Sequence, residues 1–276
     1  MSTRRLIVLV LLGTASCGSV TPAKSDGGPS SDSGTATGGK AGAAGELGTG
    51  GDTGAAGRGA SGGAGGTPGV GNTPVVRSST WAFSSDQPSV TCALLNVAPG
   101  DVLLAAVHSS GSPGVAMTAA DSAGNIYQYS QDWGANIGVG AAFTKLTAAG
   151  DVDVTVSAGN TTAGLSLFCY DLAGVNLTPT ATSATGSGTS CAVAVDLTTP
   201  QASIVVAIWA MYGSAASLTA GTGFTIAPGS PVAAHSNNYV ASEFQILGAA
   251  PSNCAMGMSV SQNWGGTCFA FSPGSR

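Results

Sequence analysis

The feature that most constrains this chain is an alternation of apolar and polar residues that begins near Val75. Apolar residues recur at every second position in short stretches, and Gly, Pro, Asn and Asp separate these stretches. Ala is plentiful but lies among Gly, Thr and Val, the helix-favouring Glu, Lys and Gln are scarce, and no stretch carries a capped amphipathic helix. The pattern therefore predicts one all-β domain at 76–276. The clearest strands are expected at 90–97, 102–108, 139–146, 152–157, 165–172, 191–197, 204–212, 239–247, 254–260 and 267–271.

The domain consists of two halves that resemble each other, at about 78–177 and 178–276, offset by about 100 residues. The matching positions include Cys92 with Cys191, Phe143 with Phe244, and Cys169 with Cys268. A single sheet cannot bury its apolar face alone, so we expect the two halves to pack on each other. We therefore predict a single antiparallel β-sandwich, jelly-roll-like and of about ten strands, built from two internal repeats. Two successive small domains are the alternative.

The order of motifs also resembles a group of uncharacterised secreted bacterial β-sandwich domains. The residues that carry the resemblance are Gly100–Leu104, the turn Asp121–Asn125 and the final aromatic strand Phe269–Phe271. The resemblance covers about residues 78–273, and its motifs have low specificity. It implies the fold and an extracellular setting, and it implies no activity.

The amino terminus has the pattern of a signal peptide, at 1–16. Arg4 and Arg5 precede the apolar run Leu6–Leu12, and small residues follow. A helix of this run would span only about 10 Å, against about 30 Å for the apolar layer of a membrane. The run therefore predicts export and does not predict a membrane-spanning helix.

Cys17 ends a stretch that resembles a bacterial lipobox, although Thr14 stands where that motif usually has Leu. The resemblance implies that Cys17 is acylated and becomes the first residue of the mature protein. With Gly18 after it, the resemblance implies an outer-membrane or cell-surface lipoprotein that contacts the membrane through its lipid alone. Ordinary cleavage near Ser16, which would leave a secreted protein, is the alternative.

Residues 17–75 contain no hydrophobic periodicity, and we expect a disordered glycine-rich tether there. Glycine recurs at every third position from Gly39 to Gly69, with one interruption at Ala60. A collagen-like triple helix would make the protein a trimer, but it needs many more prolines than this run contains. We therefore expect a flexible tether and a monomer.

Charge is sparse and acidic: 8% of the residues are charged and the net charge is −5. Within the domain the cations are Arg77, Lys145 and Arg276. Nucleic acids and anionic membranes bind proteins through clusters of basic residues. These separated cations cannot form such a cluster, so we expect no nucleic-acid partner.

Five cysteines follow the lipidation candidate, and disulfides are the default in an exported protein. The repeat favours Cys92 with Cys169 and Cys191 with Cys268, which is the same bond in each half. A pairing of Cys254 with Cys268 across a hairpin is the alternative in the second half. Because the number is odd, one thiol stays free or pairs between molecules.

Catalytic candidates are few. His108 and His235 each have a serine beside them, but no Gly-x-Ser-x-Gly turn accompanies either histidine. Glu243 is the only Glu of the domain, and we interpret it as an outward-facing strand residue. A glycosidase would need a second carboxylate facing it. We therefore expect no enzymatic activity and no cofactor other than calcium.

Binding candidates are aromatic residues near predicted loops or strand ends, whose rings could stack on sugar faces. They are Trp133, Trp264, Tyr127 and Tyr239. Asp151 and Asp153 lie two apart on a predicted strand and so point to the same face, which suits Ca²⁺. The turn at Asp121–Asn125 is a second calcium candidate.

These features favour a non-catalytic, surface-displayed sandwich that acts in adhesion by contacting a polysaccharide or a surface protein. A structural envelope protein that associates with itself is the first alternative. A carbohydrate-active hydrolase is the second alternative, and it would require a pocket that holds Glu243 with another carboxylate.

Overall fold

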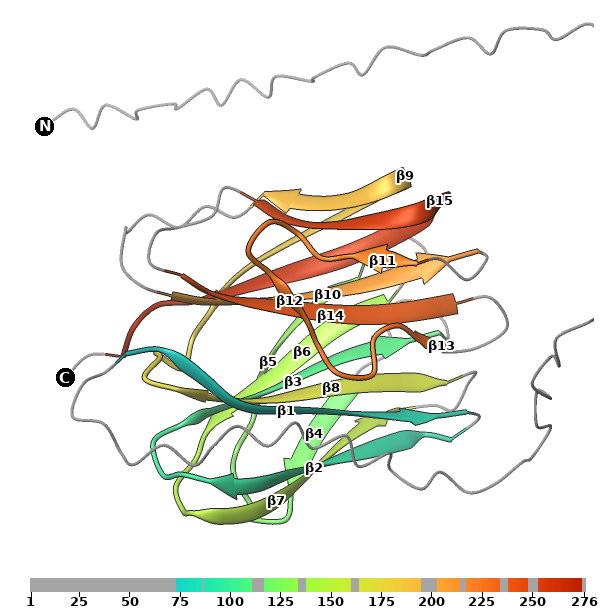
Figure 1. Cartoon of the computed structure of the whole chain (residues 1–276). Helices are drawn as coiled ribbons and strands as arrows, with labels where there is room; N and C mark the ends of the chain where they lie inside the picture. Colours follow the sequence, from blue (N-terminus) through green and yellow to red (C-terminus); the bar gives the residue numbers. More distant parts are fainter. Residues whose placement is uncertain are drawn as a thin grey trace, which may run out of the picture. The chain divides into compact units, whose positions relative to one another are not determined.

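The structure is a computed structural model that describes residues 73–274, apart from 86, 111–116, 134–137, 160–163, 195–202, 214–216, 234–237 and 248–252. For 129–133, 203 and 247 the description covers the backbone alone. The expected signal peptide, Cys17 and residues 18–72 of the tether lie outside the described residues and stay predictions, while β1 already begins at Val75. Every regular element within the described residues is a β-strand in an antiparallel sheet (Figure 1).

The first half of the domain forms two sheets from strands β1 to β8. The strand order is β1-β8-β3-β6-β5 in the larger sheet and β2-β7-β4 in the smaller one. The chain crosses repeatedly between the two sheets, which is the order of a jelly roll. The bounds are β1 Val75–Ser84, β2 Ser89–Val97, β3 Val102–Ser109, β4 Met117–Asp121, β5 Gln128–Trp133, β6 Gly138–Lys145, β7 Gly150–Ala158 and β8 Leu165–Ala173.

The second half repeats this order with longer strands. β9 pairs along most of β15, and each of them takes the place of two strands of the first half. The beginning of β9 corresponds to β1 and its end to β2, while β15 corresponds to β7 followed by β8. β10 and β14 take the places of β3 and β6. The bounds are β9 Thr180–Ala194, β10 Ser203–Tyr212, β11 Leu218–Thr219, β12 Thr225–Ile226, β13 Val232–Ala233, β14 Asn238–Leu247 and β15 Asn253–Phe271.

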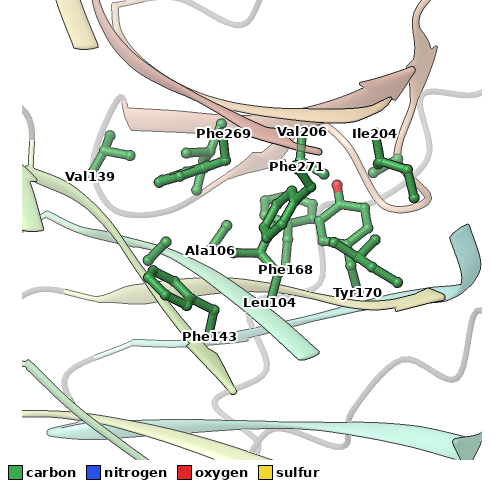
Figure 2. Packing of buried hydrophobic residues seen from close by; sticks show 14 of the residues in the cluster. Leu104, Ala106, Val139, Phe143, Phe168, Tyr170, Ile204, Val206, Phe269 and Phe271 are labelled. Atoms are coloured by element: carbon green, nitrogen blue, oxygen red, sulfur yellow. The ribbon is translucent and has the colours of Figure 1, made fainter. Parts of the chain in front are cut away.

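Three apolar cores separate the stacked layers of sheet. The central core lies between the large sheets of the two halves, and both halves supply its side chains (Figure 2). Across it the Tyr170 hydroxyl lies 2.5 Å from Ser242 Oγ. The first core lies between the two sheets of the first half, and the second core lies inside the second half. Figure 1 shows the small sheet β2-β7-β4 on one side of the stack and β9 with β15 on the other.

Burial along the strands follows from this layering. Every residue of β3 is buried, because the sheet to which it belongs is covered on both faces. β2 and β7 instead alternate between buried and exposed residues, because only one face of their sheet is covered. Continuous apolar runs in the sequence therefore mark the inner sheets, and alternating runs mark the outer ones.

The prediction of an all-β antiparallel sandwich built from two repeats is confirmed. The described residues form fifteen strands, where about ten were expected. The strands that the sequence did not reveal, among them β1, β4, β5 and the short β11 to β13, lie mostly at sheet edges. They bury few apolar side chains, so their sequences carry a weak signal.

The disulfides differ between the halves. Cys92 and Cys169 are bonded as predicted, which joins β2 to β8 across the first core. In the second half Cys254 is bonded to Cys268, and Cys191 is a buried free thiol. The hairpin alternative is therefore confirmed, and the pairing that the repeat favoured is wrong, because β15 carries a second cysteine that β7 lacks.

Candidate functional site

Trp264 is not available for stacking on a sugar, and that prediction is wrong. The residue is only 8% exposed, and its ring packs edge-to-face on Trp209 with 6.0 Å between the ring centroids. Gly186 lies opposite Trp264 on β9, and a Cβ there would come 2.7 Å from Trp264 Cζ2. The missing side chain on the neighbouring strand gives the indole room to lie in the core.

The other aromatic candidates do not gather into one surface. Tyr127 is partly buried and donates its hydroxyl hydrogen to Asp121 Oδ2 at 2.9 Å. Tyr239 is partly buried and packs against the second core. Trp133 ends β5, and its side chain lies outside the description, so its role stays a prediction. The residues described therefore provide no aromatic row.

The turn after β4 is held by its own side chains. Asp121 Oδ1 accepts hydrogen bonds from the backbone N–H groups of Ala123 and Asn125, each at 3.0 Å. Asp121 Oδ2 accepts from Asn125 Nδ2 and from the Tyr127 hydroxyl, each at 2.9 Å. With both carboxylate oxygens engaged, this Asp is a turn residue and is poorly placed to bind Ca²⁺.

The outer face of β2-β7-β4 is a largely polar surface of the first half. We call it the hydroxyl face. Its members alternate with the buried residues of the first core, and their registers align Ser89 with Ser157 and Thr118, and Thr91 with Thr155. Thr91 Oγ1 lies 2.8 Å from Thr155 Oγ1. The hydroxyl side chains of this face are Ser89, Thr91, Thr118, Thr155 and Ser157; Ala93 and Ala120 lie among them, and Asp151 and Asp153 follow at one end.

Asp151 and Asp153 are both exposed on β7 and point to the same side, as their spacing predicted. Asp151 Oδ1 accepts the backbone N–H of Asn96 at 3.0 Å. Among the described residues no group of three or more His, Cys, Asp and Glu side chains is arranged to hold a metal ion. Calcium binding by this pair stays a prediction, and it would need further oxygen ligands.

Glu243 is buried, and the interpretation of it as an outward-facing residue is wrong. Its Oε1 accepts the Trp209 indole N–H at 3.1 Å, and its Oε2 accepts the Gly221 backbone N–H at 3.0 Å. Burial raises the pKa of Glu243 to about 7, while both hydrogen bonds oppose that rise. Its hydrogen-bond partners among the described residues include no second carboxylate.

A second buried acidic group lies at the edge of the first core. Asp101 and Asp171 are both buried, and Arg77 Nε lies 2.7 Å from Asp101 Oδ2. Burial raises the pKa of Asp171, and the neighbouring Asp101 raises it further, while the Arg77 guanidinium lowers it. Arg77 joins the start of β1 to the start of β3, which is a structural contact between strands.

His108 lies in the interior, where a substrate could not reach it. It is 1% exposed on β3, and its Nδ1 has no hydrogen-bond partner. Burial lowers its pKa to about 4, so the imidazole is neutral at pH 7. Ser166 lies opposite it on β8, and its Oγ is likewise unpartnered. His235 lies outside the described residues.

The hydroxyl face escaped the sequence analysis, although a signal for it existed. The polar positions of the alternating strands at 89–97 and 150–158 are rich in Ser, Thr and Asp. Only the register between β2, β7 and β4 shows that these positions align across three strands.

No helix within the described part of the chain is long and apolar enough to cross a membrane. Comparison of the chain with protein-family models, with curated proteins and with solved structures found no match in any of the three.

Proposed function

We propose that this protein is a non-catalytic binding module, displayed at a bacterial cell surface, that contacts a polysaccharide through the hydroxyl face. The observation that carries the proposal is the alignment of Ser and Thr hydroxyls across β2, β7 and β4 on the outer face of the sheet. A hydroxyl group both donates and accepts hydrogen bonds, as sugar hydroxyls do. A rigid array of such groups can therefore match a regular polymer at little cost in conformational entropy.

The rigidity of the face comes from the strands beneath it. Val90, Cys92 and Leu94 alternate with the outward residues of β2 and anchor that strand in the first core. The bond between Cys92 and Cys169 holds β2 to the large sheet. The hydroxyls therefore keep fixed positions, and Thr91 and Thr155 already share a hydrogen bond.

Asp151 and Asp153 extend the face with negative charge. Carboxylates accept hydrogen bonds from sugar hydroxyls, and together with those hydroxyls they could complete the oxygen shell of a Ca²⁺ ion. We propose that calcium, where it binds, bridges this pair to the polysaccharide. The remaining oxygens would then come from the ligand and from water.

Display at the surface rests on the amino-terminal sequence. Two disulfides are compatible with an exported protein, because such bonds persist in oxidising compartments. A lipid on Cys17 and the tether at 17–75 would hold the domain away from the membrane. Acylation itself is tested by metabolic labelling with a palmitate analogue, which Cys17→Ser should abolish.

The decisive experiment compares two outer faces of the same molecule. The full-length chain is titrated with a panel of polysaccharides by calorimetry, with and without Ca²⁺. The double variant Thr91→Val/Thr155→Val should weaken binding by about tenfold or more, because it removes two hydroxyls from the contact. The matched control Thr219→Val alters an exposed threonine on the second half and should leave the affinity unchanged.

Two outcomes would contradict the proposal. One is that no polysaccharide of the panel binds. The other is that a polysaccharide binds the double variant as tightly as the unmodified chain, which would place the contact elsewhere.

Self-association is the second candidate, and one observation favours it. The matching outer face of the second half carries small uncharged residues, among them Ser190, Ala192, Ala255 and Gly257. A flat face of this kind could pack against a second copy. Sedimentation at increasing concentration distinguishes the two candidates: a monomer is expected here, and a dimer that Ala192→Lys disrupts would favour self-association.

A further inference from the structure

The second core contains three buried cysteines that lie near one another. Cys191 comes from β9, and Cys254 and Cys268 come from the two ends of β15. All three side chains are fully buried. Cys254 and Cys268 are bonded, with 6.3 Å between their Cα atoms, and Cys191 is a thiol.

The first half shows what else Cys268 could bond. There, Cys92 on β2 is bonded to Cys169 on β8, with 6.5 Å between their Cα atoms. The end of β9 takes the place of β2, and the end of β15 takes the place of β8. Cys191 and Cys268 therefore occupy the two positions that form a disulfide in the first half.

Cys191 and Cys254 lie on the inner side of the same pair of strands, and the Cys191 thiol donates to Met258 Sδ at 3.9 Å. Cys191 lies opposite Met256, and Cys254 lies opposite Val193. The two cysteines are thus diagonal neighbours on the inner side of β9 and β15, a relation that places Cα atoms about 7–8 Å apart and side chains closer. Cys268 approaches them from the large sheet, as Cys169 approaches Cys92.

We propose that Cys268 exchanges its disulfide partner between Cys254 and Cys191 within the folded protein. The Cys191 thiolate attacks Sγ of Cys268, a new sulfur–sulfur bond forms, and the bond from Cys268 to Cys254 breaks. Cys254 leaves as a thiolate and takes up the proton that Cys191 released. One disulfide and one thiol are present before and after, so the step needs no oxidant or reductant.

The exchange changes which strands are tied together. The bond between Cys254 and Cys268 closes a short loop within β15, whereas a bond between Cys191 and Cys268 ties β9 to β15. Burial, and to a lesser extent the neighbouring Glu243, together raise the pKa of Cys191 to about 12. Thiolate is therefore scarce at pH 7, and exchange should become faster as the pH rises.

The test maps disulfides in the full-length chain carrying Cys17→Ser. The protein is incubated at pH 8 to 10, quenched with acid, alkylated and digested, and its peptides are identified by mass spectrometry. The peptide pair Cys191–Cys268 should appear while Cys254 becomes alkylated. Well below the pKa of the attacking thiol, the initial rate should rise about tenfold per pH unit. The rate should not depend on protein concentration.

Two variants complete the design. Cys191→Ser should keep the Cys254–Cys268 bond at every pH, and Cys254→Ser should form Cys191–Cys268 when it folds. The proposal is overturned if the Cys17→Ser chain retains only Cys254–Cys268 over the whole time course. It is also overturned if folded Cys254→Ser leaves Cys191 and Cys268 both alkylatable. Should Cys254→Ser fail to fold, the time course alone decides.

Discussion

The two halves of the domain share a strand order, but their polar and reactive side chains lie on different sides of the outer layer. In the first half they lie on the exposed face, and in the second half they lie in the core. The first half encloses a core of Val, Leu, Ala and Met around one disulfide, and its outer face carries hydroxyls and carboxylates. The second half carries small residues outside, while its core holds Trp209, Trp264, Glu243 and a free thiol at Cys191. A repeated fold therefore does not imply a repeated site.

Trp209 fits into the second core because the residue opposite it on the neighbouring strand is a glycine. Trp209 stands at the position that Val107 occupies in the first half, and Gly266 stands opposite it where Leu167 lies opposite Val107. A Cβ on Gly266 would collide with the Trp209 ring. The large residue on one strand thus requires the small one on the next, which keeps the total volume of the pair nearly constant.

The comparison shows that the carboxyl in the second core is buried together with its hydrogen-bond partners. Glu243 stands where the first half has Ala142, and it is held by an indole N–H and a backbone N–H. Trp209 supplies the indole, so the larger side chain also provides a donor for the buried carboxyl. The buried acid and the tryptophan form one unit that the first half lacks.

The largest loss of stability is expected when a large side chain fills the space that Gly266 leaves for the Trp209 ring. Gly266→Leu should lower the free energy of unfolding by more than about 4 kcal/mol, because the new side chain occupies the space of the Trp209 ring. The double variant Trp209→Val/Gly266→Leu restores the pair found in the first half and should recover about 1–3 kcal/mol relative to additivity. Urea unfolding measures both, and strictly additive losses would refute the compensation.

The next largest loss of stability is expected when either disulfide is removed, and the two losses should differ. Removing Cys92–Cys169 opens a loop with a sequence separation of 77, and removing Cys254–Cys268 opens one with a separation of 14. Chain entropy then predicts losses of about 4.5 and about 3 kcal/mol in the free energy of unfolding. Paired Cys→Ala variants in urea measure this difference, and equal losses would show that loop length does not govern the stability of the halves.

The buried Glu243 should give the second half its own pH dependence. Because its folded-state pKa of about 7 lies above the ordinary value of 4.5, the folded protein holds a proton that the unfolded chain releases. This stabilisation is complete below pH 4.5 and is lost as the pH rises to 7, by about 3 kcal/mol in all. Glu243→Gln should remove that slope from the free energy of unfolding measured across pH 4 to 8.

The difference between this variant and the unmodified chain isolates Glu243 from other groups. The pKa of Asp171 is raised as well, and its contribution runs in the same direction. His108 acts in the opposite direction, since its pKa is lowered to about 4 and its contribution is lost as the pH falls below 6.5. If the free energy of unfolding depends on pH in the same way in Glu243→Gln, then folding does not change the pKa of Glu243.

The smallest effect on stability concerns the outer faces. Asp153→Asn should change the free energy of unfolding by less than about 0.5 kcal/mol, because the side chain is exposed. It should nevertheless abolish any calorimetric signal from Ca²⁺. The variant Asn253→Asp/Ala255→Asp places a carboxylate pair at the matching positions of the second half, where calcium binding should then appear. A calcium signal that survives Asp153→Asn would place the ion elsewhere.

The sequence alone determined the all-β class and the two repeats. These follow from local pattern: a period of two, the spacing of turn residues, and residues at matching positions in both halves. The same matching positions predicted one disulfide correctly and the other wrongly. For the fold class and the repeats each strand carries its own signal.

Only the tertiary structure decided which residues meet. Trp264 appeared to lie in a loop and is buried, because Gly186 on another strand leaves space for it. Glu243 appeared to face outward and is buried, because its partners come from β10 and from the turn at Gly221. The hydroxyl face exists only through the register of three strands. Register and packing depend on residues distant in the chain, and the local pattern of one strand does not contain them.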